Sequence, residues 1–255
     1  MYVAAGSGHI DVMKWLKEQG VNVNASNRKT DYTPMFMAAY YGQADAMKWL
    51  GEQGAGFAPN RHGESPMMFA AKRGHVDAMA WLVEQGVDVN FHERRMANKT
   101  ALMWAAYFGH IDAVKWLVEQ GADVNAKDVF GGTALTEAFP RHFDIVKWLV
   151  EQGAEIDVNA VNDGGDTLMH KASGRLDIMK WLREQGASVD AKNKWGRTPM
   201  HLAVFGGNVD ALKWLKEQGL DVNAKDNEGR TPLSLARARI HDATAERWLR
   251  ANGAR

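Results

Sequence analysis

The sequence of 255 residues contains no cysteine and no long apolar run. Without cysteine, disulfide bonds, thiolate metal sites and a cysteine nucleophile are excluded, and a reducing compartment is favoured. A membrane helix needs about 18 to 20 consecutive apolar residues, and no stretch of the sequence reaches that length. The first residues, from Met1 to His9, also lack the basic start of a signal peptide. These absences predict a soluble, cytoplasmic protein that does not bind a membrane.

Neither sign of charge is in excess. The 31 lysine and arginine residues balance 31 aspartate and glutamate residues, so the formal net charge is zero. Such a chain has no long-range electrostatic preference for nucleic acid, an anionic membrane or a cationic substrate. Hydrophobic residues make up 45% of the chain and charged residues 24%, which is typical of a folded protein with a core. Any charge preference must therefore come from local patches.

Motifs for catalysis or cofactor binding are also missing. The sequence has no Gly-x-Ser-x-Gly elbow, no Gly-x-x-x-x-Gly-Lys-Ser/Thr phosphate loop and no Gly-x-Gly-x-x-Gly dinucleotide motif. No two histidines have the i, i+4 spacing of a helical zinc site. We therefore predict a protein without catalytic residues, metal or cofactor, which is not an enzyme.

What the sequence does contain is a repeat. The pair Trp-Leu recurs at spacings of 34, 32, 35, 32, 33, 33 and 34 residues, and a glycine follows five residues after each tryptophan. A fixed period of this length predicts stacked copies of one small structural motif, none of which can bury its apolar face alone. The tryptophans are Trp15, Trp49, Trp81, Trp116, Trp148, Trp181, Trp214 and Trp248.

Each repeat has the signals of two helices. A Thr-Pro pair starts the first helix, because the threonine hydroxyl accepts from an early N–H group and proline fits the first helical position. An aspartate such as Asp112 opens the second helix, where negative charge suits the helix dipole. The glycine after each Trp-Leu pair supplies the left-handed residue that ends it. The helix starts are Thr33-Pro34, Ser65-Pro66, Thr198-Pro199 and Thr231-Pro232.

The best-formed repeat reads Gly-Arg-Thr-Pro-Met-His-Leu-Ala from Gly196 to Ala203. This stretch and the period of about 33 residues resemble the ankyrin-repeat family, with its Thr-Pro-Leu-His-x-Ala signature. The resemblance covers residues 1–255 and implies an all-α solenoid of about eight helix-turn-helix units with short projecting β-hairpins. We predict a single domain, 1–255, with repeats 1 to 8 at 1–24, 25–58, 59–90, 91–125, 126–159, 160–190, 191–223 and 224–255.

Two regions depart from the pattern. Residue 1 falls inside the first helix of repeat 1 without a visible N-terminal cap, so one interpretation is a fragment of a longer protein. In repeats 5 and 6, the stretch from Gly153 to Asn159 is two residues longer than its counterpart in repeat 4. The stretch from Thr167 to Asp177 is two residues shorter than its counterpart in repeat 7. We predict locally distorted or shortened helices there.

The tryptophan ladder is interpreted as core. One tryptophan per repeat at an inner position of an apolar helix stripe predicts eight mostly buried rings rather than a cofactor or electron path. Replacing the central Trp116 by alanine is then expected to cost about 3 to 5 kcal/mol.

Positions that do not repeat are candidates for binding a partner. In ankyrin-like proteins the residues before the glycine that ends the first helix, and the hairpin tips, face the concave groove, so the resemblance assigns binding to them. Arginine and large aromatic residues at such positions are typical of protein interfaces. The candidates are Tyr40, Tyr41, Lys72, Arg73, Arg94, Arg95, Tyr107, Phe108, Phe130 and Trp195.

The predicted function is a non-catalytic scaffold that binds another protein on its concave face, across repeats 2 to 5. Basic residues beside aromatic ones predict a partner with an acidic and apolar surface. Two alternatives stay open: an active site in the groove or regulation of an attached catalytic domain, and single-stranded nucleic-acid binding, which zero net charge disfavours. In a further alternative, the rings fold back on neighbouring repeats and serve packing alone.

Overall fold

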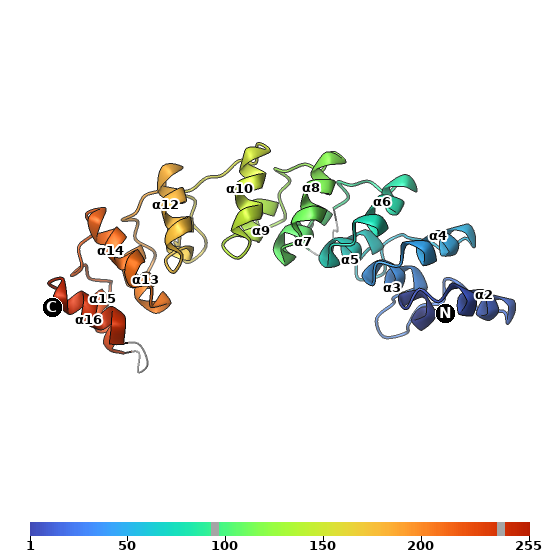
Figure 1. Cartoon of the computed structure of the whole chain (residues 1–255), viewed down its shortest axis with the longest axis horizontal. Helices are drawn as coiled ribbons and strands as arrows, with labels where there is room; N and C mark the ends of the chain where they lie inside the picture. The colour runs from blue at the N-terminus through green and yellow to red at the C-terminus, as the bar shows by residue number, and fades with distance from the viewer. Residues whose placement is uncertain (93–96, 239–242) are drawn as a thin grey trace. The chain divides into compact units, whose positions relative to one another are not determined.

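The structure is a computed structural model that describes residues 1–92, 97–238 and 243–255. Within these residues sixteen helices follow one another as eight pairs, joined by turns and loops without a strand (Figure 1). Contacts divide the chain into two compact bodies, which we call the N-terminal body, Met1–Glu155, and the C-terminal body, Ile156–Arg255. The eight helix pairs correspond to the eight predicted repeats.

The N-terminal body contains five helix pairs. Its first helices pack side by side in one layer and its second helices pack against them in another (Figure 1). The first helices are α1 (Tyr2–Gly6), α3 (Pro34–Tyr40), α5 (Pro66–Arg73), α7 (Ala101–Phe108) and α9 (Ala134–Ala138). The second helices are α2 (Ile10–Glu18), α4 (Ala44–Glu52), α6 (Val76–Glu84), α8 (Ile111–Glu119) and α10 (Phe143–Glu151).

The C-terminal body contains three helix pairs with the same order of elements. Its first helices are α11 (Leu168–Lys171), α13 (Pro199–Gly206) and α15 (Pro232–Arg237), and its second helices are α12 (Leu176–Glu184), α14 (Val209–Glu217) and α16 (Ala243–Ala251). Consecutive first helices contact one another, as do consecutive second helices. Each pair therefore covers the apolar face of the next.

Of the predicted helix starts, Ser65-Pro66 is confirmed, whereas among the described residues the Thr33 hydroxyl has no capping partner at the start of α3. The Ser65 hydroxyl accepts from the Met68 N–H at 3.1 Å and Pro66 follows at the first helical position. At the other end of α5, Gly74 adopts the left-handed conformation with φ 72°. A residue with a Cβ atom is strained in that conformation, which explains the glycine.

The fully buried residues of the second helices are mainly aliphatic, and the prediction of mostly buried ladder tryptophans is confirmed for seven of the eight, which are buried or intermediate, and wrong for Trp15. In α8 the fully buried residues are Ala113, Val114 and Leu117, and Trp116 is only half-buried. Successive residues of a helix are about 100° apart, so tryptophan and the leucine after it cannot both face the centre of the core. Trp81 and Trp214 are buried, Trp15 is exposed, and Trp49, Trp116, Trp148, Trp181 and Trp248 are intermediate.

The predicted irregularity of repeats 5 and 6 is confirmed. The first helices α9 and α11 have five and four residues, whereas α5, α7 and α13 have eight. The boundary between the two bodies falls between Glu155 and Ile156, inside the stretch that the sequence shows to be lengthened. The single-domain assignment stays a prediction.

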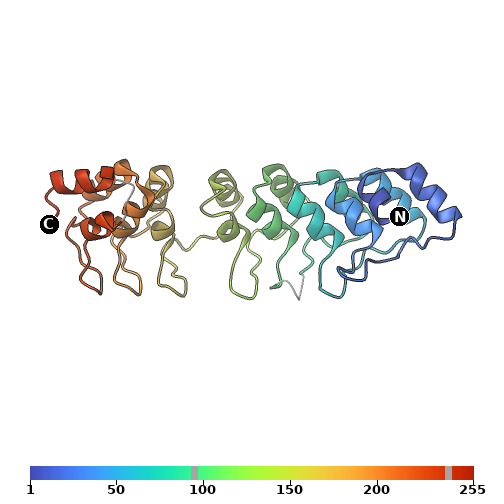
Figure 2. The same ribbon diagram turned by 90° about the horizontal axis from the view of Figure 1, so that it is seen from below.

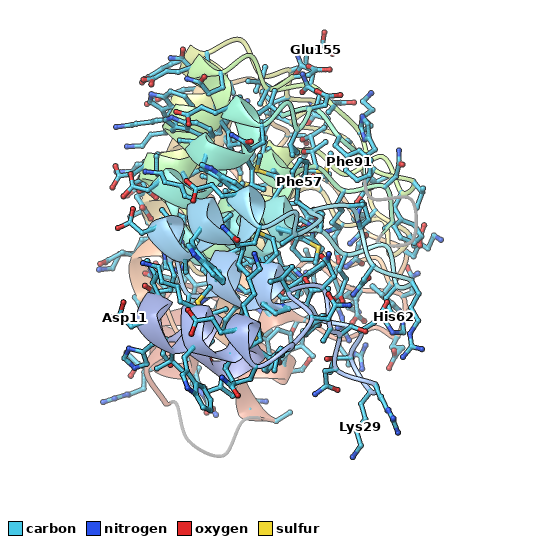
Figure 3. All side chains as sticks on the ribbon, turned by 90° about the vertical axis from the view of Figure 1, so that its right-hand side faces the viewer. Asp11, Lys29, Phe57, His62, Phe91 and Glu155 are labelled. Atoms are coloured by element: carbon cyan, nitrogen blue, oxygen red, sulfur yellow. The ribbon has the colours of Figure 1, made fainter. Side chains whose placement is uncertain are left out.

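The loops after the second helices of the N-terminal body project from one side of the helices (Figure 2). Lys29 and His62 lie on this loop side, and Asp11 lies among the helices (Figure 3). Several tips are closed turns: in one, the Asp128 N–H donates to the Gly132 carbonyl at 2.8 Å. The Asp128 carboxylate also accepts from the N–H groups of Phe130 and Gly132 at 2.9 and 2.7 Å. No strand ladder joins these tips in the described residues, so the projecting β-hairpins are not confirmed.

Candidate protein-binding face

Helices α3 and α5 carry a cluster of packed aromatic rings. Phe36 and Phe69 are buried at 2% and 8% exposure, and their ring centroids lie 5.8 Å apart. Tyr32 and Tyr40 pack edge-on against Phe69 at 5.1 and 5.6 Å. Phe69 therefore contacts three rings and forms the centre of this cluster. Tyr41, which is half exposed, continues it through an edge contact to Tyr40 at 4.9 Å.

A second cluster lies on α7. Trp104, Tyr107 and Phe108 take i, i+3 and i+4 positions, which share one face of a helix. The Trp104 ring lies 6.4 Å from Tyr107 and 6.3 Å from Phe108, and the last two rings meet edge-on at 5.0 Å. Tyr107 and Phe108 stay 39% and 45% exposed. Their rings are therefore ordered by contacts inside the helix and still present apolar area to a partner.

Cations lie over the rings of both clusters. The Lys72 ammonium is 4.0 Å from the Trp104 ring centroid and 5.5 Å from that of Phe69, so it links the two clusters. The Arg73 guanidinium lies 5.0 Å from the Tyr40 ring. Such contacts are attractive because the face of an aromatic ring is electron-rich. We call this surface the aromatic face: Tyr32, Phe36, Tyr40, Tyr41, Phe69, Lys72, Arg73, Lys99, Trp104, Tyr107, Phe108 and Arg141.

The end of the aromatic face between α7 and α9 holds a partly buried ion pair. The Lys99 ammonium lies 2.7 Å from the Glu137 carboxylate and 3.9 Å from that of Asp128. It also lies 5.3 Å from the Trp104 ring, and Arg141 lies 6.0 Å from the Tyr107 ring. The two carboxylates therefore offset the charges of Lys99 and Arg141, and the excess positive charge of the aromatic face comes from Lys72 and Arg73.

At the other end of the face, Tyr32 is a neutral hydrogen-bonding group. Burial, together with the neighbouring Glu64 carboxylate, raises the pKa of the Tyr32 hydroxyl to about 12. The phenol therefore stays protonated at neutral pH and adds no charge to the aromatic face.

The aromatic face also leaves a polar atom unsatisfied. The Trp104 indole N–H is buried and has no acceptor among the described residues. A buried donor without a partner typically costs about 1 to 3 kcal/mol. A large ring retained at such a cost is typical of a position used for something other than stability.

The structure brings together most of the residues predicted to bind. Six of the ten lie on the aromatic face: Tyr40, Tyr41, Lys72, Arg73, Tyr107 and Phe108. Phe130 stands on a turn tip with 86% of its surface exposed. Trp195 belongs to the C-terminal body, is 49% exposed, and its ring lies against Gly164 of the preceding turn. Arg94 and Arg95 lie outside the described residues.

Sequence reasoning missed the inner part of the face. Phe69 and Trp104 lie four residues after the helix-starting Ser65 and Thr100, at the position that Leu202 occupies in repeat 7. An aromatic ring in place of leucine in two consecutive repeats was the available signal. Nothing in the sequence pointed to Lys99, because its contacts are with rings and carboxylates that other elements of the fold supply.

Histidines of the N-terminal body serve the packing of repeats. The His75 ring Nε2 lies 3.1 Å from the Tyr40 carbonyl, and the His110 ring Nε2 lies 3.0 Å from the Lys72 carbonyl. Burial lowers the pKa of His75, so it is neutral at pH 7 and donates one N–H. These bonds fix the backbone that carries Tyr40 and Lys72.

Two further features bear on chemistry. Among the residues that the structure describes, no group of three histidine, aspartate or glutamate side chains is arranged to hold a metal ion. None of the helices in this part of the chain combines the length and apolar composition needed to cross a membrane.

Repeated helix pairs joined by side-chain-closed turns define a helical repeat protein. Family models described as ankyrin repeats (3 copies) match residues 1–93, 55–128, 91–162 and 127–193, and a model of ankyrin repeats (many copies) matches 172–216. The chain belongs to the ankyrin-repeat family. No curated protein matches it. The predicted all-α ankyrin-repeat solenoid is thereby confirmed, and ankyrin repeats are generally non-catalytic modules of protein–protein interaction.

Proposed function

We propose that this protein is a non-catalytic scaffold that binds another protein on the aromatic face, across repeats 2 to 5. The observation that supports this most is the row of rings from α3 to α7 with Lys72 and Arg73 stacked over them. Aromatic side chains contribute much of the binding energy of protein interfaces because they bury large areas and lose few rotamers, and arginine adds bidentate hydrogen bonds to carboxylates. The lack of cysteine favours the cytoplasm.

The partner that fits this face has an acidic and apolar surface. Tyr107 and Phe108 offer exposed ring edges for apolar side chains, and Arg73 and Arg141 offer guanidinium groups for carboxylates. Phe130, on its rigid turn, is a contact at the rim. Trp195 of the C-terminal body is a separate candidate contact.

The test is affinity capture with the wild-type chain, followed by binding measurements on the double variant Tyr107→Ala, Phe108→Ala. We expect a partner with an acidic, apolar segment, and a loss of at least about 2 kcal/mol in its binding free energy. The fold should survive at a cost of about 1 to 2 kcal/mol, because both rings are partly exposed. The matched control is Phe205→Ala, a partly exposed ring in the C-terminal body. A captured partner that binds the double variant as tightly as the wild type contradicts the proposal.

Salt dependence separates this proposal from nucleic-acid binding. Rings and cations also suit a single-stranded oligonucleotide, whose affinity falls steeply as salt rises because counterions are released. For a protein partner anchored by Tyr107 and Phe108 we expect a modest fall between 50 and 200 mM salt, of about tenfold or less. A loss of about a thousandfold, together with binding of single-stranded oligonucleotides, would assign the face to nucleic acid.

A further inference from the structure

The second helices show one interruption of their charge pattern. The residue before the ladder tryptophan is basic in seven repeats, and in repeat 3 it is Ala80. The residue two after the tryptophan is valine, lysine or arginine in seven repeats, and in repeat 2 it is Gly51. Both small residues fall on neighbouring helices, α6 and α4, so two larger side chains are missing from adjacent parts of the surface.

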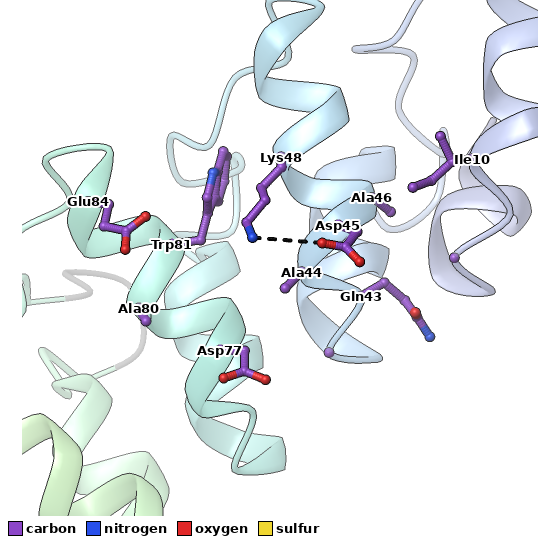
Figure 4. A pocket seen from close by; sticks show the side chains of 12 residues that line it. Ile10, Gln43, Ala44, Asp45, Ala46, Lys48, Asp77, Ala80, Trp81 and Glu84 are labelled. Carbon is purple, nitrogen blue, oxygen red and sulfur yellow. Dashed lines mark ion pairs between the residues drawn. The ribbon is translucent and has the colours of Figure 1, made fainter.

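A groove opens where these side chains are missing. A space of about 500 Å³ lies over α4 and α6, lined among others by Asp45, Lys48, Asp77 and Trp81 (Figure 4). A second space of about 380 Å³ lies beside Gly51 and shares Lys48, Trp81 and Glu84 with the first. Volumes of this size match those of ligand sites, about 300 to 1,000 Å³. We call the two together the α4–α6 groove.

Trp81 forms a fixed wall of this groove. A Cβ atom on Gly51 would come within 2.7 Å of the Trp81 ring, so only glycine lets the indole lie against α4. Phe57 supports the ring from another side with an edge contact at 6.3 Å. Trp81 is 6% exposed, in contrast to the half-buried Trp49 and Trp116.

The charges around the groove are mainly negative. Helix α6 contains Asp77 and Glu84 and is the one second helix without a lysine or arginine. In the described part of the chain neither carboxylate forms an ion pair. Lys48, the cation of the lining, pairs with Asp45 at 3.7 Å, but both side chains are more than half exposed and the pair is weak. The groove therefore offers unpaired negative charge beside an ordered indole.

We propose that the α4–α6 groove is a second interaction surface, which binds an arginine- or lysine-bearing segment of a partner protein. An incoming cation pairs with Glu84 or with Asp77, which lie two turns apart on α6, beside the edge of Trp81 that lines the groove. A guanidinium suits a carboxylate because it is planar and donates several hydrogen bonds. This surface lies on the second helices and does not depend on the aromatic face, which lies on the first helices and takes the opposite charge.

The probe is a fluorescent peptide of alternating arginine and glycine, titrated into the full chain, with a glutamate–glycine peptide as its counterpart. The main variant is Ala80→Lys, which restores the residue found in most other repeats. Val150→Lys on α10 is the matched control, because it adds the same charge at a position where other repeats carry lysine. Glu84→Gln weakens the site without adding bulk. Isotope labelling of tryptophan lets NMR follow the Trp81 indole N–H.

We expect saturable binding of the arginine peptide alone, and a shift of the Trp81 indole signal. Ala80→Lys should weaken binding by about tenfold or more, because it places a like charge in the site, and Glu84→Gln by about threefold. Val150→Lys should change the affinity less than about twofold. Equal weakening by Ala80→Lys and Val150→Lys, an unmoved Trp81 signal, or no binding of the arginine peptide would each overturn the proposal.

Discussion

The two bodies of this chain solve the same stacking problem with different chemistry. In the C-terminal body, the His170 ring Nδ1 accepts from the Thr167 N–H at 3.2 Å and its Nε2 lies 3.0 Å from the Arg197 carbonyl. His201 repeats this arrangement with Thr198 and Arg230. At the same position, three residues after the helix-starting residue, repeats 2 to 4 of the N-terminal body have Phe36, Met68 and Met103. At this position the C-terminal body therefore uses histidine hydrogen bonds, whereas repeats 2 to 4 of the N-terminal body use ring and methionine packing.

The turns of the two bodies show a similar difference in side-chain hydrogen bonding. Asp226 of the C-terminal body is buried and accepts from the side chains of Arg230 and Arg197 at 2.9 and 3.4 Å. Asp128 of the N-terminal body has Lys99 at 3.9 Å, and that lysine pairs more closely with Glu137.

The largest effect that tests this comparison is expected at Phe69. Phe69→Ala removes the ring that contacts Phe36, Tyr32 and Tyr40, so the N-terminal body should lose about 4 kcal/mol. Hydrogen exchange should then speed up in α3, α5 and α7 and stay unchanged in α13 and α14. A loss of less than about 1 kcal/mol would mean that the rings serve the surface and contribute little to the packing.

The corresponding test in the C-terminal body is Asp226→Asn. Loss of the buried charge beside two guanidinium groups should destabilise this body by about 3 kcal/mol, measured by hydrogen exchange of α13 and α15. Asp128→Asn is the matched variant, because it keeps the turn-closing oxygen and disturbs one more distant ammonium. We expect about 1 kcal/mol there. Equal losses of stability in the two variants would show that the two arginines do not add to the stability of the C-terminal body.

A third test concerns the core of the N-terminal body. Trp116→Ala should lower the free energy of unfolding by about 2 kcal/mol, because Trp116 is half-buried. This is less than the loss of about 3 to 5 kcal/mol expected from the sequence alone. Leu117→Ala, which empties a fully buried position one residue later, should cost about 3 kcal/mol in the same denaturant titration. A larger loss for Trp116→Ala than for Leu117→Ala would show that the tryptophans form the main core.

The smallest effect is expected in how the free energy of unfolding depends on pH. Burial lowers the pKa of His201 below its usual 6.5, so its stabilising contribution is complete above that value and is lost as pH falls through the folded-state pKa. His75 acts in the same direction in the N-terminal body. Urea titrations at pH 7 and 5 should therefore show a loss of about 1 kcal/mol in either body. His201→Gln should flatten this step in the C-terminal body alone.

A second acid step should belong to the C-terminal body. Burial alone would raise the pKa of Asp226, but hydrogen bonds from Arg230, Glu228 and Arg197 outweigh it and lower the pKa to about 2. Its contribution is therefore present above about pH 4 and is lost between pH 4 and 2. Asp226→Asn should abolish that part of the unfolding profile. A step that persists in the variant must come from other carboxylates.

The sequence predicted what is local and missed what depends on neighbours. Helix starts such as Ser65-Pro66 and helix ends such as Gly74 follow from backbone conformation, and the short α9 and α11 follow from counted residues. The sequence did not show that Leu117 rather than Trp116 is fully buried, because an apolar stripe does not say which of two adjacent residues faces the centre of the core. The place of Lys99 depends on α7, α9 and a turn at once, which no periodicity encodes.

Five turn tips of the described residues are closed by the side-chain oxygen of their first residue rather than by the residues at their apex. Asn60, Asp128, Asn162, Asn193 and Asp226 all accept from N–H groups two and four residues ahead. The residues between them differ completely, from Arg61-His62 to Val129-Phe130 to Lys194-Trp195, while the backbone path is kept. The residue that closes the turn and the residues exposed at its apex are therefore different. We expect substitutions at an apex to change the exposed surface without loss of the turn.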